Sequence, residues 1–364
     1  MTLTVAEAPR RERTKMAVID CDIHNYLPSE KTVREYLPER WRQHLDAFGA
    51  RIPHGMYYPL ANMHAARTDA WPPSGQIPGS DLSFAQKQLL DLWDMEYGVL
   101  FPLTGAGKQL NLGYSAAMST AVNLWQTAEW LDPEPRLRAS MAIPYEDGPL
   151  AVAEIERFAR DPRFIQVIFE SRTLEPLGRR RYWPIYEAAA RHGLPIGMHF
   201  GALGGWPIGS GIGHPSFYIE YHTGQMTSFQ DQMISLICEG VFEEFPDLKF
   251  VLIEGGFGWL PPLMWRLDRA YSRLKAEVPH LKKLPSEYIR EHFWFTTQPV
   301  EEPHNPRDFQ VLLDDLGMDD RIMFSTDYPH WDFDSPDTAI PSSIPADARR
   351  NIMSENARKL YRLA

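Results

Sequence analysis

The chain has little of what would indicate a secreted, membrane-spanning or disulfide-stabilised protein. Its 364 residues include only two cysteines, Cys21 and Cys238, which argues against a disulfide scaffold and favours a reducing compartment. No apolar run approaches the roughly 18 residues that cross a bilayer. The N-terminal residues are charged and lack the apolar stretch of a signal peptide. We therefore expect a flexible arm over residues 1–16, one domain over 17–364 and a cytoplasmic location.

Positive charge is also scarce. Lys and Arg number 37 against 48 Asp and Glu, so the formal net charge at pH 7 is −11. The one basic cluster is Arg179-Arg180-Arg181, and the aromatic residues Tyr182 and Trp183 follow it at once. Such a short cluster is more typical of a solvated loop than of a nucleic-acid surface. We expect a small-molecule substrate and no nucleic-acid or membrane partner.

Short apolar segments alternate with helical patterns along the chain. Eight of them have the length and composition of buried strands, and they span residues 17–22, 97–102, 139–143, 164–169, 194–200, 250–254, 293–296 and 322–325. Strand–helix alternation predicts a parallel sheet, and eight units favour a closed (β/α)8 TIM barrel. The competing open sheet would normally carry a Gly-rich phosphate turn after its first strand. Here that turn contains Asp20, Asp22 and His24, which suit a cation better than a phosphate.

The helical patterns fit the outer layer of such a barrel. We expect helices over residues 83–96, 149–160, 182–192, 228–244, 261–276, 305–316 and 354–363, and Ser83 and Gln86 have capping-box spacing. Long insertions follow strands one, five and eight, at residues 26–81, 201–224 and 328–344. Loops of this length are usually functional. We interpret them as a lid and a substrate wall, with contacts in a homodimer or higher homo-oligomer as the alternative.

Four residues that can bind a metal lie at or just beyond the ends of three predicted strands. Asp22 and His24 follow the first strand, His199 the fifth and Asp327 the eighth. In an eight-stranded parallel barrel these strand ends open onto one face, so the four side chains are expected to meet. Each has a structural alternative, such as a core histidine at His199 or a turn at Asp327. Two carboxylates and two imidazoles suit one Zn²⁺ or Mn²⁺ ion, with Fe²⁺ as a further candidate.

Several motifs resemble the amidohydrolase-related group of the amidohydrolase superfamily. They are Ile19-Asp20-Cys21-Asp22-Ile23-His24, Met198-His199, Ser325-Thr326-Asp327-Tyr328-Pro329-His330, Ile253-Glu254-Gly255-Gly256-Phe257-Gly258-Trp259-Leu260-Pro261 and Arg266-Leu267-Asp268. The resemblance covers nearly everything from residue 17 to residue 363. It implies a (β/α)8 barrel with a divalent metal, in a group that includes aminocarboxymuconate-semialdehyde, resorcylate and carboxyvanillate decarboxylases. Members of this group often pair as dimers.

The chain departs from the superfamily pattern at three places. Most superfamily hydrolases carry His-x-His after strand one, whereas Asp22 takes the first position here, and an acidic residue there is similar to the resorcylate-type decarboxylases. Many relatives carry a histidine where Glu254 stands. Strand four ends in Glu170 and Arg172 without a lysine, which disfavours a carbamylated two-metal site.

Two kinds of chemistry fit such a metal centre. Non-oxidative decarboxylation of a small aromatic or conjugated carboxylic acid is slightly favoured over hydrolysis of an amide, lactone or ring C–C bond. A non-catalytic barrel subunit is a remote alternative. Asp327 and Glu254 are the candidates for proton transfer, and His330 either contacts the substrate or supports Asp327.

Four further residues are candidates for binding the substrate. Arg172 at the end of strand four could clamp a carboxylate through its planar guanidinium, with a structural ion pair as the alternative. Tyr221, His222 and Trp331 lie in the insertions after strands five and eight. We interpret these three as pocket-lining residues, and an ordinary place in a surface loop is their alternative.

Overall fold

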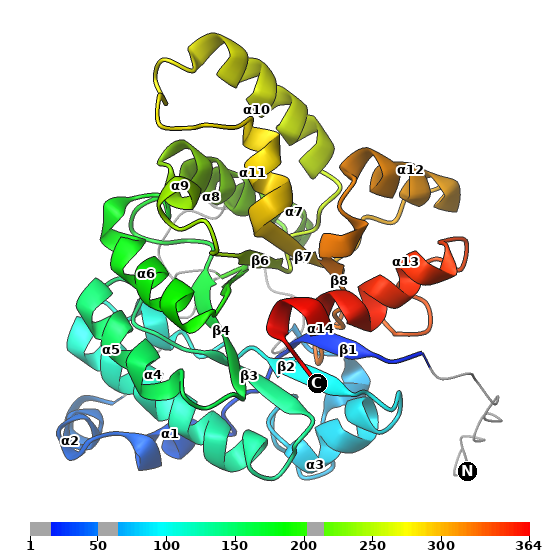
Figure 1. Ribbon diagram of the computed structural model, residues 1–364. Coiled ribbons are helices and arrows are strands. Elements are labelled where there is room, and N and C mark those ends of the chain that lie inside the picture. The colour runs from blue at the N-terminus through cyan, green and yellow to red at the C-terminus, as the bar shows by residue number, and fades with distance from the viewer. Residues whose placement is uncertain (1–15, 50–64, 202–214) are drawn as a thin grey trace, which may run out of the picture.

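The computed structural model describes residues 16–49, 65–201 and 215–364, and they form a barrel of eight parallel strands surrounded by helices (Figure 1). The strands follow one another around the sheet in chain order. They are β1 (Ile19–Ile23), β2 (Tyr97–Leu100), β3 (Leu137–Met141), β4 (Phe164–Glu170), β5 (Ile196–His199), β6 (Phe250–Ile253), β7 (Phe293–Thr296) and β8 (Ile322–Met323). The predicted barrel is confirmed, and each strand end lies within two residues of its predicted position.

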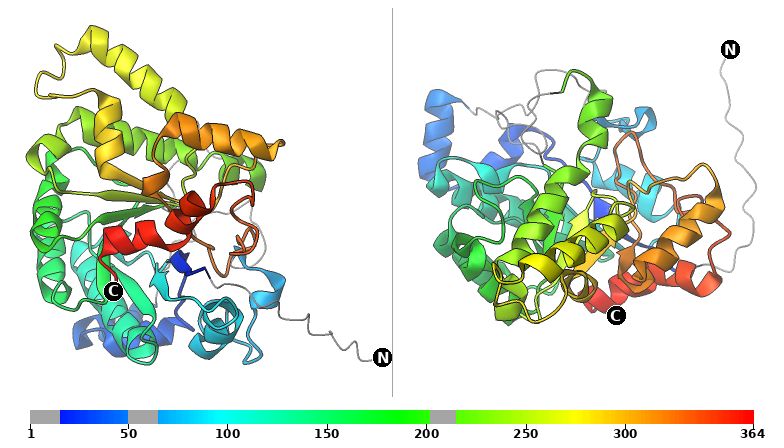
Figure 2. Two further views of the ribbon diagram at one scale, coloured as in Figure 1. Left: turned by 45° about the vertical axis from the view of Figure 1, so that its right-hand side comes forward. Right: turned by 90° about the horizontal axis from the view of Figure 1, so that it is seen from above.

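Helices cover the outside of the barrel, as two further views show (Figure 2). They are α1 (Glu30–Tyr36), α2 (Glu39–Phe48), α3 (Leu82–Ala85), α4 (Leu112–Gln126), α5 (Gly148–Phe158), α6 (Trp183–His192), α7 (Tyr218–Thr223), α8 (Met226–Cys238), α9 (Val241–Glu244), α10 (Leu260–Leu274), α11 (Pro285–His292), α12 (Pro306–Leu316), α13 (Ala346–Arg350) and α14 (Asn356–Tyr361). No helix among the described residues is long and apolar enough to cross a membrane.

Two expectations about the helices are wrong. Helix α3 is capped by Asp81, whose Oδ1 accepts hydrogen bonds from Phe84 N (3.1 Å) and Ser83 Oγ (2.8 Å). Ser83 is therefore inside the helix, and the capping box predicted for Ser83 and Gln86 is absent. The helix expected over 228–244 is divided into α8 and α9 at Gly240, whose φ of 79° interrupts helical backbone.

Six helices, α1, α2, α4, α7, α11 and α13, were not expected from the sequence. The long helix α4 shows why, because most of its residues are buried. A helix that is buried on most sides lacks the alternation of apolar and polar faces on which sequence patterns depend. The insertion 26–81 contributes α1 and α2, while residues 50–64 of that insertion lie outside the described part of the chain.

The barrel closes between its first and last strands just beyond the end of β8. Cys21 N donates to Phe324 O at 2.9 Å, and Asp327 N donates to Asp22 O at 3.1 Å. The second of these bonds joins the backbones of two candidate metal ligands directly. The C-terminal helix α14 lies beside this seam and contacts both β1 and β8 (Figure 1).

Asp20 reinforces the seam with its side chain. Its carboxylate is fully buried and accepts hydrogen bonds from Thr326 N (2.9 Å), Thr326 Oγ1 (2.6 Å) and Asp22 N (3.1 Å). Asp20 thereby fixes the backbone of Asp22 and of the residue before Asp327, so it sets how far apart the two strand ends lie.

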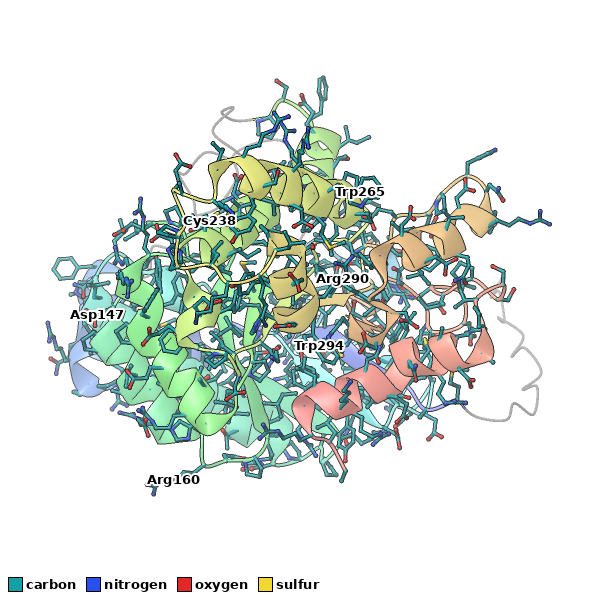
Figure 3. All side chains as sticks on the ribbon, turned by 45° about the horizontal axis from the view of Figure 1, so that its top comes forward. Asp147, Arg160, Cys238, Trp265, Arg290 and Trp294 are labelled. Carbon is teal, nitrogen blue, oxygen red and sulfur yellow. The ribbon has the colours of Figure 1, made fainter. Side chains whose placement is uncertain are left out.

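The outer helices also present apolar side chains to solvent. Trp265 projects from α10, as the view with all side chains shows (Figure 3), and its side chain is 60% exposed. Such a residue is compatible with subunit contacts, and homo-oligomer formation stays a prediction.

Candidate metal centre

The structure brings the four predicted ligands together at the C-terminal mouth of the barrel. Asp22 and His24 leave β1 on the same side, His199 is the last residue of β5, and Asp327 lies four residues beyond β8. All four are at most 1% exposed. His24 Nε2 lies 2.7 Å from Asp327 Oδ1 and 3.6 Å from Asp22 Oδ1, while His199 Nε2 lies 3.6 Å from Asp22 Oδ2.

The two imidazole rings are held in the orientation that a metal ligand requires. His24 Nδ1 donates to the carbonyl oxygen of Phe101 at 2.9 Å, and His199 Nδ1 donates to the carbonyl oxygen of Phe200. A carbonyl can only accept, so Nδ1 carries the proton in both rings. Each Nε2 of the neutral ring then keeps a lone pair directed into the site.

Among the described residues, several atoms that face one another in the site make no well-directed hydrogen bond: both carboxylate oxygens of Asp22, Nε2 of His24, Nε2 of His199 and Oδ2 of Asp327. The two Nε2 atoms nevertheless have carboxylate oxygens close by, on Asp327 at 2.7 Å and on Glu254 at 3.0 Å. Buried polar atoms without a partner are rare and costly in folded proteins. A divalent cation would satisfy all of them at once, so this donor set fits the metal that the sequence predicts.

His330 offers a second way of grouping the ligands. His24, Asp327 and His330 have ligand atoms close together, as do Asp22, His24 and His199. However, His330 Nδ1 is hydrogen-bonded to Asp327 Oδ1 (2.7 Å) and its Nε2 to Tyr26 Oη (2.8 Å). Both ring nitrogens are occupied, so the geometry favours His330 as the residue that orients Asp327.

Glu254 lies beside the predicted ligands, directly after β6. Its Oε2 is 3.0 Å from His199 Nε2. Burial raises the pKa of this carboxyl well above its usual range, and the nearby carboxylates of Asp327, Asp332 and Asp22 raise it further. Its backbone φ is 60°, a left-handed conformation that non-glycine residues seldom adopt and that often marks functional sites.

The pKa of Asp327 shifts in the opposite direction, downward, and the backbone φ of this residue, 59°, is also left-handed. Burial alone would raise the pKa of Asp327, but the imidazoles of His330 and His24 outweigh burial and hold it well below its usual range. Burial would likewise lower the pKa of His24, but Asp22 and Asp327 outweigh it and set this pKa at about 9. A cation that binds here must displace the proton of His24.

Aromatic side chains form a wall at the rim of the site. Tyr218 of α7 stacks on His222 with ring centroids 5.7 Å apart, and Trp331 Nε1 donates to Tyr218 Oη at 3.2 Å. His222 Nε2 is 2.9 Å from Asp332 Oδ2, which also accepts from Gln298 Nε2 at 2.8 Å. The loop after β8 thereby holds α7 in place, and both predicted residues, His222 and Trp331, belong to the wall.

Arg172 and Tyr221 lie together a little further out. Both pack against Phe200, with Arg172 Cζ 5.0 Å from the ring centroid and the Tyr221 ring 5.2 Å from it. None of the three guanidinium nitrogens has a hydrogen-bond partner among the described residues, so the structural ion pair weighed for Arg172 is absent from this part of the chain. Arg172 lines a cavity of about 420 Å³ between α8 and the loop after β4, and none of the four ligands lines it. Its role as a substrate clamp stays a prediction.

Sequence reasoning missed four residues of this site: Tyr26, Phe101, Tyr218 and Gln298. Tyr26 follows His24 by two positions, and Phe101 and Gln298 lie just beyond strands β2 and β7. The rule that strand ends meet at the barrel mouth could therefore have identified these three. Tyr218 belongs to α7, which the sequence did not predict.

The chain is similar to proteins of known sequence and structure over nearly its whole length. The amidohydrolase family profile matches residues 19–363. The γ-resorcylate decarboxylase of Polaromonas sp. is 28% identical over 317 residues, which cover 80% of this chain and 93% of that protein.

Two solved structures share the fold. A dihydroxybenzoic acid decarboxylase from Polaromonas sp., with bound manganese and the inhibitor 2-nitroresorcinol, has a TM-score of 0.64 at 20% identity and matches 95% of this chain and 97% of its own. An amidohydrolase from Mycobacterium avium subsp. paratuberculosis has a TM-score of 0.70 at 22% identity, over 96% and 100% of the two chains.

Proposed function

The chain belongs to the amidohydrolase family, and from this membership we propose that it is a metal-dependent decarboxylase of a small hydroxylated aromatic acid. The observation that carries the proposal is the set of buried, unpartnered ligand atoms on Asp22, His24, His199 and Asp327. An acidic residue at position 22, in place of the usual histidine, favours decarboxylation over hydrolysis. The similarity to γ-resorcylate decarboxylase supports the same reaction.

Manganese is the metal that we propose for this site. The structurally similar decarboxylase from Polaromonas sp. holds manganese, and a donor set with two carboxylates suits this ion. Asp22, His24, His199 and Asp327 would hold it. When bound, the cation would supply positive charge that orients the carboxylate and a neighbouring hydroxyl of the substrate and stabilises negative charge on the ring.

The reaction also needs a proton at the carbon that loses the carboxyl group. When the C–C bond breaks, its electron pair stays on the ring carbon and must be taken by one proton, so that a carboxylate plus H⁺ gives the arene plus CO2. Glu254 and Asp327 are the two candidates for this proton transfer. Because Asp327 is held by two imidazoles, His24 and His330, we assign the proton transfer to Glu254 and the positioning of Asp327 to His330.

The aromatic wall supports a planar substrate. Tyr218, His222 and Trp331 place three rings at the rim of the site, and aromatic groups prefer offset-stacked or edge-to-face contacts with one another. Trp331 remains 47% exposed, which leaves one ring of the wall available to a bound molecule.

Replacing Glu254 with Gln should lower kcat by at least about 100-fold, because an amide of similar size cannot donate an acidic proton. The matched control is Glu301→Gln, since the carboxylate of Glu301 accepts a hydrogen bond from Phe257 N in the neighbouring loop and has no place in the proposed chemistry. Steady-state kinetics of both variants provide the measurement. A loss of less than threefold in Glu254→Gln would reduce Glu254 to a structural role.

The proposed function is tested with a substrate panel. Manganese-loaded protein is incubated with hydroxybenzoates, and separately with amides and lactones, while CO2 release and ring opening are measured. We expect CO2 release from at least one hydroxybenzoate bearing a hydroxyl next to the carboxylate. Hydrolysis of an amide or lactone without any CO2 release would replace the proposal by metal-activated hydrolysis.

A further inference from the structure

A second, smaller cavity lies at the barrel mouth between the loops that follow β2 and β3 and the end of β4. Its lining includes Phe101, Gly107, Tyr145, Ile168 and Glu170. Its volume is about 20 Å³, counted as the space open to the centre of a water-sized sphere. A cavity of this size holds one water or one group of similar size.

The cavity adjoins the metal centre but none of the four ligands lines it. The ring of Phe101 stacks on His199 with centroids 4.4 Å apart, and the carbonyl oxygen of the same residue accepts the hydrogen bond from His24. Glu170 is the register partner of His199 across β4 and β5. A group in this cavity would therefore lie next to Phe101, whose ring also packs on the proposed ligand His199.

Tyr145 presents an unused hydroxyl here. Its side chain is 3% exposed, and Oη has no hydrogen-bond partner in the part of the chain that the structure describes. Other deeply buried tyrosine hydroxyls in the described chain are satisfied, those of Tyr182, Tyr186, Tyr288, Tyr328 and Tyr361. A buried hydroxyl without a partner costs free energy that phenylalanine would avoid. The hydroxyl of Tyr145 therefore indicates that a group able to hydrogen-bond with it occupies the cavity.

The neighbouring loop is shaped to hold the Tyr145 ring. A Cβ at Gly107 would lie 2.4 Å from Ile143 O and 2.7 Å from Tyr145 Cε1, so only glycine allows this close approach. The next residue, Lys108, places Nζ 2.6 Å from Glu170 Oε2. Glu170 thus contributes a carboxylate to the lining of the cavity. The ammonium group of Lys108, which does not line the cavity, balances the charge of this carboxylate.

We propose that this cavity is a subsite for one phenolic hydroxyl of the substrate. The hydroxyl would accept a hydrogen bond from Tyr145 Oη and donate one to Glu170, because a hydroxyl is both donor and acceptor. A carboxylate can only accept and would meet the carboxylate of Glu170, so it is disfavoured. This inference rests on the proposed function and deepens it, since it assigns a specificity for a substrate hydroxyl that the metal does not hold.

The test compares Tyr145→Phe with wild type on two substrates that differ by one hydroxyl, 2,6-dihydroxybenzoate and 2-hydroxybenzoate. We expect kcat/KM to fall about tenfold on the dihydroxy acid, the effect of one lost hydrogen bond, and to stay unchanged on the monohydroxy acid. Tyr186→Phe is the matched control, because its hydroxyl donates to Leu177 O at 2.7 Å, away from the cavity. Tyr186→Phe should leave kcat/KM unchanged on both acids.

A binding measurement keeps the inference separate from the proposed reaction. Manganese-loaded wild type should bind 2-nitroresorcinol about tenfold more tightly than 2-nitrophenol, and Tyr145→Phe should bind the two alike. If no benzoate is decarboxylated, the proposed function fails, while this comparison still decides the subsite. Equal affinity of wild type for both compounds, no binding of either, or an equal loss on both in Tyr145→Phe overturns the subsite and leaves a cavity that holds only water.

Discussion

Replacing Asp327 with Asn should lower turnover on the order of 10³-fold or more while the barrel stays folded. The carboxylate lies 2.7 Å from His24 Nε2 and 2.7 Å from His330 Nδ1. An amide removes the negative charge that a cation needs and can present an NH2 group to the nitrogen of His24. Because the side chains have nearly the same shape, we expect the circular dichroism spectrum, and the thermal midpoint measured without metal, to change little.

The matched control for this prediction is Asp334→Asn. Asp334 lies in the same loop, and its backbone N donates to Thr326 O at 3.0 Å, but its side chain is outside the set of ligands. Kinetics of the two variants, together with metal analysis, separate loss of the metal from loss of the fold. If Asp327→Asn turned over substrate as fast as Asp334→Asn, Asp327 would have no place in the active site.

Removing the metal should abolish activity, and one equivalent of Mn²⁺ per chain should restore it. The side chains of the four proposed ligands are almost completely buried and keep unpartnered atoms, so the metal-free site holds buried polar groups that are only partly satisfied. A ligand that binds only the folded state also stabilises that state. We therefore expect the thermal midpoint of the chelated protein to rise when Mn²⁺ is added.

His24→Ala serves as the control for metal binding, because it removes the imidazole that the two ligand groups share. Its thermal midpoint should not respond to Mn²⁺. Metal content by mass spectrometry and activity during titration provide the measurements. Full activity in a preparation shown to be metal-free, or two ions per chain at full activity, would contradict a site for one cation.

The strands and the meeting of the ligands were accessible from the sequence because both depend on simple rules. A buried parallel strand is a short apolar run whatever its neighbours, and its C-terminal end must lie at the barrel mouth. The four proposed ligands, Asp22, His24, His199 and Asp327, lie at the ends of such runs. Their meeting at the barrel mouth could therefore be predicted without any knowledge of distances.

Other features depend on contacts that a sequence does not encode locally. The hydrogen bond from Tyr26 to His330 joins residues 304 positions apart, and its existence depends on how two loops fold over the mouth. The unpartnered hydroxyl of Tyr145 can be recognised only when all its neighbours are placed. Arg172 was correctly placed at a strand end, but the direction of its side chain depends on Phe200 and α8.

The seam between β1 and the end of β8 has a consequence for how the protein is made. Asp22 and Asp327 are joined by a backbone hydrogen bond across it, and 305 residues of synthesis separate them. On the ribosome, a nascent chain that already contains Asp22 acquires Asp327 only 305 residues later. Manganese capture should therefore follow translation of the last strand, and prematurely terminated fragments should leave the ribosome without bound metal.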